Sequence, residues 1–152
     1  RLYWHIRKIV ISHDDADDVL QNTFIKIFRN IDTFNQQSKL YSWIYRIATN
    51  ESITFINKRA KERKEDISDY QQELVSTLTN DNLFTGDEIQ LILQKAIATL
   101  PEKQKLVFNM KYFDELKYTE ISEILETSVG ALKASYFHAV KKIEKYIQTR
   151  AN

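Results

Sequence analysis

The sequence has very few of the residues that build tight turns and cross-links: its 152 residues include two glycines, one proline and no cysteine. Without cysteine the chain forms neither disulfides nor thiolate metal sites, as is typical of a reducing cytosol. The shortage of glycine and proline argues against the many tight turns of an all-β fold. No apolar run approaches the length of a membrane span, and no signal peptide is recognisable. Leu, Ile, Lys and Glu instead recur at helical spacing, which predicts an all-α protein.

Residues that commonly carry catalysis or bind metals are also few and scattered. The histidines, His5, His13 and His138, form no cluster in the sequence. There is no glycine-rich phosphate loop, and no carboxylates and histidines share a metal-ligand spacing. We therefore expect no enzyme activity, no metal or other cofactor and no small-molecule substrate.

The formal net charge of +1 hides an uneven charge distribution. Aspartates cluster at residues 14–18, whereas Lys and Arg dominate residues 39–64. Residues 65–88 carry acids without a single base, and residues 129–150 are again basic. Two basic patches separated by an acidic segment favour contact with a polyanion such as nucleic acid.

Residues 114–145 have the pattern of a helix-turn-helix unit. The first helix has apolar residues on one side, namely Leu116, Ile121, Ile124 and Leu125. A break at residues 127–130 follows, in which Ser128 is a candidate N-cap. The second helix has an apolar stripe made of Leu132, Tyr136, Val140, Ile143 and Ile147.

The opposite face of this second helix carries small residues first and basic residues behind them. Its members are Gly130, Ala131, Lys133, Ala134, His138, Lys141, Lys142 and Lys145. Small residues let the start of a helix sit deep in a major groove, while lysines behind them hold phosphates. The alternative is structural, because alanine favours helices and lysines commonly form a solvated face.

The rest of the chain divides into two helical parts. We expect two small helical bundles at residues 1–64 and 87–152, joined by a flexible linker at residues 65–86, with the helix-turn-helix in the C-terminal bundle. In the first bundle, residues 17–31 predict an amphipathic helix with a buried stripe of Val19, Leu20, Phe24, Ile27, Phe28 and Ile31. Bundles of this size are marginally stable alone and often depend on a partner.

Three stretches resemble the motifs of bacterial extracytoplasmic-function (ECF) sigma factors. Residues 17–24 read DDVLQNTF, which resembles the family's E-D-L-V-Q-D/E-V/T-F motif for core polymerase. Residues 40–50 read LYSWIYRIATN, which is similar to the F-x-x-W-L-x-R-I-A-x-N helix. Residues 100–104 and 129–143 resemble the family's L-P-x-x-x opening and V-G-T-V-K-S-R recognition helix. These motifs follow one another in the family's order and cover most of the chain outside the linker.

The resemblance implies a promoter-recognition subunit that binds core RNA polymerase and directs transcription initiation. It implies core-polymerase contacts at Asp18, Gln21 and Asn22. It implies contacts with the melted −10 element at Asn35, Ser38, Lys39, Trp43, Arg46, Asn50, Lys58 and Arg59. It implies contacts with the duplex −35 element at Gly130, Ala131, Lys133, Ala134, His138, Lys141 and Lys142. Further implied are an anti-sigma partner and a location in the cytoplasm, or at the membrane when that partner holds the chain there.

The sequence also departs from the family pattern at several positions. Asn22 replaces the usual acid of the polymerase motif, and Lys117 replaces a usual capping serine. Glu126 stands where the turn usually has glycine, which predicts a costlier turn. Ser135 and His138 stand where the family often has arginine, which affects the base contacts expected there.

Two other functions are compatible with parts of the pattern. A helix-turn-helix regulator would bind duplex DNA without polymerase, and it would have no need of Asp18 and Gln21. An interaction module would bind no nucleic acid, and the two basic patches argue against it. Trp43 shares an apolar stripe with Leu40 and Ile47, so a core position is the alternative to base stacking for this residue.

Overall fold

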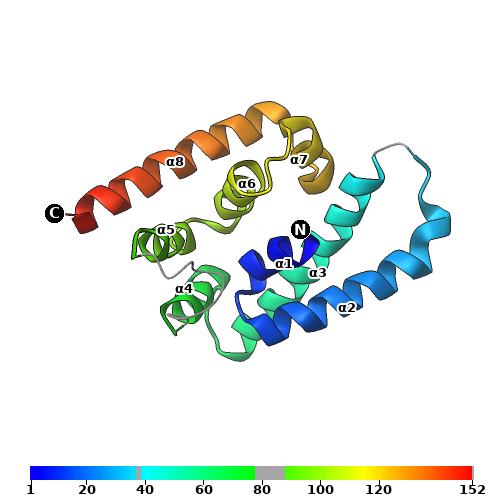
Figure 1. Cartoon of the computed structure of the whole chain (residues 1–152), viewed down its shortest axis with the longest axis horizontal. Coiled ribbons are helices and arrows are strands. Elements are labelled where there is room, and N and C mark those ends of the chain that lie inside the picture. Colours follow the sequence, from blue (N-terminus) through cyan, green and yellow to red (C-terminus); the bar gives the residue numbers. More distant parts are fainter. Residues whose placement is uncertain (37–38, 78–87, 152) are drawn as a thin grey trace.

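The computed structural model of the chain describes residues 1–36, 39–77 and 88–151, and every regular element in these ranges is helical. The first half contains α1 (Leu2–Val10), α2 (His13–Asn30), the short 3-10 helix η1 (Ile31–Thr33) and α3 (Leu40–Glu62). Helices α1, α2 and α3 contact one another in pairs (Figure 1). The expected all-α fold with helical bundles is confirmed.

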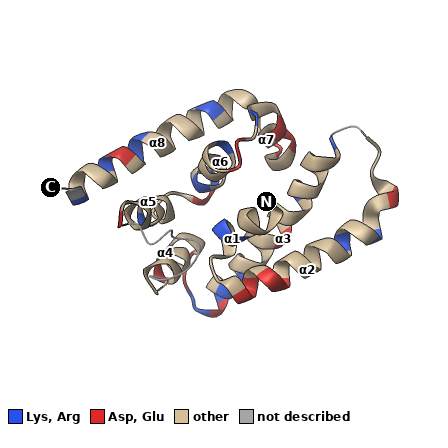
Figure 2. Ribbon diagram, viewed as in Figure 1, with Lys and Arg blue, Asp and Glu red and all other residues tan. Residues whose placement is uncertain are grey.

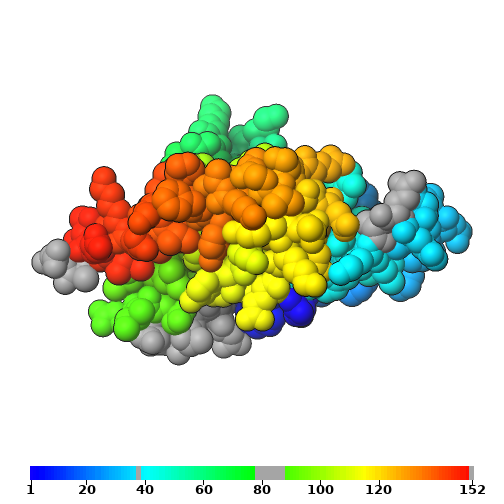
Figure 3. All heavy atoms as spheres, turned by 90° about the horizontal axis from the view of Figure 1, so that it is seen from above, coloured from blue at the N-terminus to red at the C-terminus, as the bar shows by residue number. Residues whose placement is uncertain are grey.

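The second half contains α5 (Glu88–Ala98), α6 (Glu102–Tyr112), α7 (Tyr118–Leu125) and α8 (Val129–Ala151). Helix α8 packs against α5, α6 and α7, and it lies across the near face of the molecule in Figure 3. Pro101 precedes α6 as its N-cap, where its missing N–H and fixed φ suit the start of a helix. The long α8 is therefore buried along one side and open to solvent along the other.

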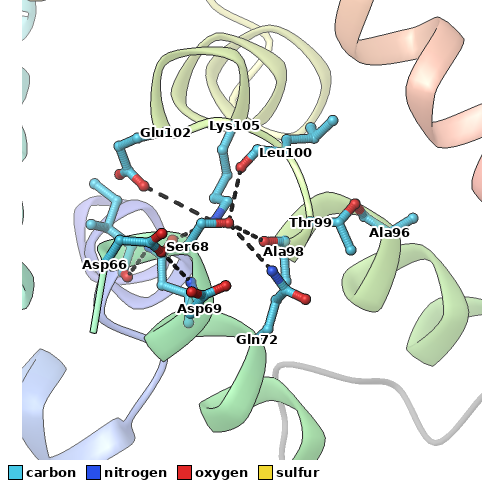
Figure 4. A network of polar contacts seen from close by, with 12 residues as sticks. Asp66, Ser68, Asp69, Gln72, Ala96, Ala98, Thr99, Leu100, Glu102 and Lys105 are labelled. Atoms are coloured by element: carbon cyan, nitrogen blue, oxygen red, sulfur yellow. Dashed lines mark hydrogen bonds and ion pairs between the residues drawn. The ribbon is translucent and has the colours of Figure 1, made fainter. Parts of the chain in front are cut away.

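Part of the expected linker is a helix that touches both halves. Helix α4 (Ile67–Thr77) lies within the expected linker, and it packs on α3 and α5. The Ser68 hydroxyl donates to the carbonyl oxygens of Ala98 (3.1 Å) and Leu100 (3.4 Å), as Figure 4 shows. Ser68 thereby satisfies carbonyl groups left free at the end of α5. Residues 78–86 of the expected linker lie outside the described residues.

A buried polar relay connects α1, α4 and α6. The Gln71 side chain of α4 donates to the carbonyl oxygen of Ile9 in α1 (2.8 Å) and accepts a hydrogen bond from Lys105 of α6. The Lys105 ammonium also lies 4.0 Å from the Glu102 carboxylate (Figure 4). Burial lowers the pKa of Lys105 to about 8, and the nearby Glu102 and Asp66 only partly oppose this effect.

The two halves share apolar cores. Tyr45 of α3 is 1% exposed and belongs to one cluster with Val107, Met110 and Leu116 of the second half. Leu106 of α6 belongs in turn to the cluster around α1 and α3. Fully burying a side chain of this size contributes about 1.5–3 kcal/mol, so the contact between the halves is a substantial part of the fold.

The buried stripe predicted for α2 needs correction. The helix begins at the N-cap Ser12, whose hydroxyl accepts from the Asp15 N–H (3.4 Å). Of the predicted buried stripe, Val19 and Ile27 are buried, whereas Phe24 and Phe28 are 44% and 74% exposed. The buried side of α2 is narrower than predicted, because it is formed by Ala16, Val19, Thr23 and Ile27. At this turn of the helix Thr23 is buried in place of the neighbouring Phe24.

Candidate nucleic-acid and polymerase interfaces

The turn between α7 and α8 is built from side-chain hydrogen bonds and one left-handed residue. Ser128 caps α8 as predicted, and its hydroxyl accepts from the Ala131 N–H at 3.2 Å. Glu126 ends α7 with φ 53° and ψ 46°, the left-handed conformation that glycine adopts without cost. A residue with a Cβ pays about 1–2 kcal/mol there, so the predicted costlier turn is confirmed. The start of α7 is held by Glu120, whose carboxylate accepts from the Lys117 N–H at 2.9 Å.

This turn orients α8 so that one face is buried and the other is free. Leu132, Ala139 and Ile143 are buried against the rest of the second half. All seven residues predicted for −35 contact are exposed together on the opposite face: Gly130, Ala131, Lys133, Ala134, His138, Lys141 and Lys142. A Cβ added at Gly130 would meet nothing within 4 Å, so packing in the chain does not require a small residue there.

The exposed face of α8 includes an aromatic residue that sequence reasoning missed. Phe137 is 57% exposed and lies between Ala134 and Lys141 at helical spacing. The Lys141 Nζ lies 5.6 Å from the centre of its ring. Phe137 does not belong to the apolar stripe predicted for this helix. The helical spacing therefore already placed it on the exposed side, and the sequence could have revealed it. Figure 2 shows basic residues recurring along α8.

A second exposed stripe runs along α3. Lys39, just before the helix, and Arg46 and Asn50 within it are exposed, and Trp43 is half-buried between them. Their steps of four, three and four residues place these side chains on one face. The structure thus brings together four of the predicted −10 residues, Lys39, Trp43, Arg46 and Asn50.

The start of this stripe borders an apolar hollow. A cavity of about 470 Å³ is lined by Ile31, Phe34, Gln36 and Leu40. The centres of the Phe34 and Trp43 rings lie 5.2 Å apart. Trp43 is half-buried, so it is not a core residue, and its contact with Phe34 leaves only part of its ring open for stacking with a base. Asn35 is exposed, and its sequence neighbours Phe34 and Gln36 line this cavity. Ser38 lies outside the described residues. Three of the four residues that line this hollow are apolar, and one of them, Phe34, has a ring on which a nucleobase can stack.

The two basic residues near the end of α3 differ from each other. Lys58 is exposed, whereas Arg59 lies 3.7 Å from the Asp15 carboxylate and 4.9 Å from the centre of the Phe55 ring. Burial raises the pKa of Asp15, and the charge of Arg59 opposes this shift. Arg59 therefore helps to join α2 to α3, and its predicted DNA contact would have to compete with this role.

A third exposed face lies on α2. Asp18, Gln21 and Asn22 are exposed, as predicted for a partner surface. Ile25 and Phe28 continue the same face one and two turns later, with 46% and 74% exposure. Exposed apolar side chains next to polar ones are typical of a protein-binding surface. Sequence reasoning missed Ile25 and assigned Phe28 to the core.

The stripe on α3 meets the second half of the chain. Arg46 forms an ion pair with Glu126 of the turn between α7 and α8. In a separate contact between the halves, the buried Asp114 lies 3.3 Å from both His5 and Lys8 of α1. Burial acts to raise the pKa of Asp114, but contact with His5 and Lys8 outweighs it and keeps the pKa below its ordinary value.

Neither a metal site nor a membrane span is found in the described part of the chain. Across residues 1–36, 39–77 and 88–151, no group of three His, Asp or Glu side chains is arranged to hold a metal ion. In the same ranges, no helix combines the length and apolar character needed to cross a bilayer.

Sequence comparison finds two family matches in order along the chain. Residues 1–62 match Sigma-70 region 2, and residues 90–143 match Sigma-70 region 4. The chain is 31% identical to the ECF RNA polymerase sigma-E factor of Haemophilus influenzae, over 91% of this chain and 77% of that protein. It is also 31% identical to the ECF RNA polymerase sigma factor SigW of Bacillus subtilis, over 97% of this chain and 83% of that protein.

Structure comparison gives the same fold. The sigma factor RpoE of Bartonella quintana, solved in complex with the anti-sigma factor NepR, has a TM-score of 0.72 at 19% identity. That match covers 97% of this chain and 89% of RpoE. CnrH, solved with the cytosolic domain of CnrY, has a TM-score of 0.69 at 20% identity, with 97% and 80% coverage.

Proposed function

Because the chain belongs to the ECF RNA polymerase sigma factors, which bind core polymerase and direct transcription initiation, we propose that its three exposed helix faces divide this work. The α2 face would bind core polymerase, the α3 stripe the melted −10 element, and the α8 face the duplex −35 element. The chain itself would perform no covalent chemistry, since polymerase carries the active site. It would act in the cytoplasm, where core polymerase transcribes.

The polymerase surface on α2 is proposed to combine polar and apolar contacts. Asp18 and Gln21 occupy the positions of the family motif, and Asn22 replaces an acid there. Ile25 and Phe28 add apolar surface to this face, and that surface is exposed to solvent in the free chain. Since apolar burial contributes about 25 cal/mol per Å², Phe28 is expected to add more to affinity than Asn22.

The −10 surface on α3 is proposed to stabilise separated strands. A flipped base would enter the hollow beside Phe34 and Leu40, where aromatic and apolar walls replace the lost stacking. Asn35, Ser38 and Lys39 are close in the sequence to the residues that line the hollow, and Arg46 and Asn50 follow along the helix. Lys58 and Arg59 would meet the backbone further along. Stacking of one base on an aromatic ring is worth about 1–3 kcal/mol, which offsets much of the cost of unstacking.

The −35 surface on α8 is proposed to read the major groove. Gly130, Ala131 and Ala134 let the helix approach the base edges, and Lys133 lies beside them. Lys141 and Lys142 lie two turns later, near the phosphate backbone. His138 and Phe137 lie between these groups, and the Phe137 ring is suited to contact a thymine methyl group.

An anti-sigma factor is the further partner that we propose. Of the two solved structures with this fold, the sigma factor RpoE is in complex with the anti-sigma factor NepR, and CnrH is in complex with the cytosolic domain of CnrY. The exposed apolar residues of α2 offer a surface that this partner would cover in competition with polymerase.

The observation that best supports this division is that Lys39, Arg46 and Asn50 lie on an exposed face at α3, while the predicted −35 residues lie on a separate exposed face of α8. A plain helix-turn-helix regulator explains only the second of these faces. The test is run-off transcription by holoenzyme on an ordinary promoter and on a template with a pre-opened −10 region. Arg46→Ala should be defective on the duplex and largely rescued on the pre-opened template.

Lys133→Ala is the matched control for this experiment. It should lose about 1–3 kcal/mol of promoter affinity on both templates, because the −35 element is duplex in each. Equal rescue of both variants, or of neither, would contradict the assignment of −10 contact to α3 and −35 contact to α8.

A further inference from the structure

Lys133 is the one lysine or arginine among residues 129–139, which form the first three turns of α8. Ser135 and His138 stand where the family often has arginine. The proposed reading of −35 base edges by a positive charge therefore depends on this one side chain. A lysine carries its charge on a flexible four-carbon stem, so it loses much rotamer freedom when it binds at one position. A neighbour that restricts the stem beforehand would reduce this loss.

Tyr118, the first residue of α7, is such a neighbour. The Lys133 Nζ lies 5.9 Å from the centre of the Tyr118 ring. This is within the distance of about 6 Å at which an aromatic face attracts a cation. Lys133 is exposed, whereas Tyr118 is half-buried. The contact thus joins an exposed charge of the second helix of the helix-turn-helix to a ring that the first helix holds.

The Tyr118 ring is fixed by two further sets of contacts. It packs against the apolar cluster that contains Ile121 and Leu132. Lys111, near the end of α6, has its Nζ 4.6 Å from the centre of the ring and donates to the carbonyl oxygen of Leu116 at 3.3 Å. Helices α6, α7 and α8 therefore meet at this ring, which gives it a defined position in the chain before DNA binds.

We propose that Tyr118 is a positioning residue that holds the Lys133 ammonium in place for the −35 base edges. Removal of the ring should reduce sequence discrimination more than general affinity for DNA. The reason is that general affinity comes from phosphate contacts, which are assigned to Lys141 and Lys142 further along α8. This inference rests on the proposed contact between Lys133 and the −35 element.

The test measures promoter discrimination by holoenzyme. Parent and variants bind a set of promoter duplexes in which the −35 base pairs are exchanged one at a time. Lys133→Ala identifies the base pair that Lys133 reads. Tyr118→Leu keeps apolar bulk but removes the ring, and it should lower discrimination at that same pair about two- to five-fold, the range expected for a cation–π contact at an exposed site. Discrimination at the other pairs and the salt dependence should stay as in the parent.

Three comparisons distinguish positioning from a merely structural role. Tyr118→Phe keeps the ring and should keep the parent's discrimination. In the Lys133→Ala background, Tyr118→Leu should have no further effect, because the side chain that the ring positions is gone. Tyr112→Leu is the matched control, since Tyr112 of α6 stacks on Phe108 with ring centres 5.2 Å apart. This variant should match the parent at every −35 base pair.

NMR of the whole chain without DNA tests the contact itself. The ε-methylene protons of Lys133 should resonate upfield of the ordinary lysine position in the parent and in Tyr118→Phe, because an aromatic ring shields protons above its face. In Tyr118→Leu they should return toward the ordinary position. Lys141, whose Nζ lies 5.6 Å from the centre of the Phe137 ring, is an internal reference, and its signals should be the same in all three proteins.

The outcomes separate positioning by Tyr118 from the proposed function. If Lys133→Ala lowers discrimination at one base pair and Tyr118→Leu does not, the positioning role is wrong and the −35 role of Lys133 stands. If Lys133→Ala changes discrimination at no −35 pair, the −35 role of Lys133 is wrong, and the positioning role is wrong with it. A loss in Tyr118→Leu that is equal at all pairs, or that persists in the Lys133→Ala background, would make Tyr118 structural and overturn the proposal.

Discussion

Lys105 provides a quantitative prediction about how the halves are joined. Its ammonium is buried, donates to Gln71 of α4 and has a pKa lowered by burial from 10.5 to about 8. The unfolded chain therefore keeps a proton on this group between these pH values, while the folded chain releases it. The free energy of unfolding should rise with pH across this window, because the unfolded state binds more protons. At about 1.36 kcal/mol per pKa unit, the full rise is on the order of 3 kcal/mol.

Urea unfolding followed by circular dichroism tests this prediction. From about pH 8 to about pH 9.5 the parent should gain about 2 kcal/mol of stability from this group. Lys105→Met keeps the aliphatic stem but cannot ionise, so it should lose this pH-dependent gain. Lys103→Met, an exposed lysine of the same helix, should keep the parent's slope. A parent whose stability is flat over this range, or a Lys105→Met variant with the parent's slope, would refute the reasoning.

The remaining predictions test the three faces separately. Asp18→Ala combined with Gln21→Ala should weaken capture of core polymerase while changing stability by less than about 0.5 kcal/mol, because both side chains are exposed; a matching loss of thermal stability would make them structural instead. Ala134→Glu should abolish transcription that depends on the −35 element, and parental activity would exclude this face from DNA contact. Lys141→Ala should weaken specific and non-specific binding alike and lower the salt slope by roughly one, whereas an unchanged slope would remove it from the phosphate contacts.

Elements with a strong period were predictable from the sequence. The stripe containing Leu132 and Ile143 fixed which side of α8 is buried, and the position of Ser128 marked where that helix begins. The left-handed Glu126 was also expected, because it replaces a glycine of the family's turn. The stripe and the cap are local patterns that the sequence shows directly, whereas the turn at Glu126 was expected from the resemblance to the family.

Features that depend on packing between distant segments were not predictable. Phe28 satisfies the helical period of α2, but the buried line of this helix passes through Val19, Thr23 and Ile27 and leaves Phe28 exposed. The pairing of Arg46 with Glu126 joins residues far apart in the chain, and no periodic pattern signals it. The same is true of Asp114, whose burial follows from the way α1 packs beside α6.

Promoter-specific run-off transcription with purified core polymerase tests the central claim most directly. The chain alone should make no transcript, and core polymerase alone should not start at the promoter. Together they should yield one transcript of defined length, and Ala134→Glu or Arg46→Ala should each reduce it sharply. Specific binding of the free chain to duplex promoter DNA, with no effect on where polymerase starts, would contradict the account.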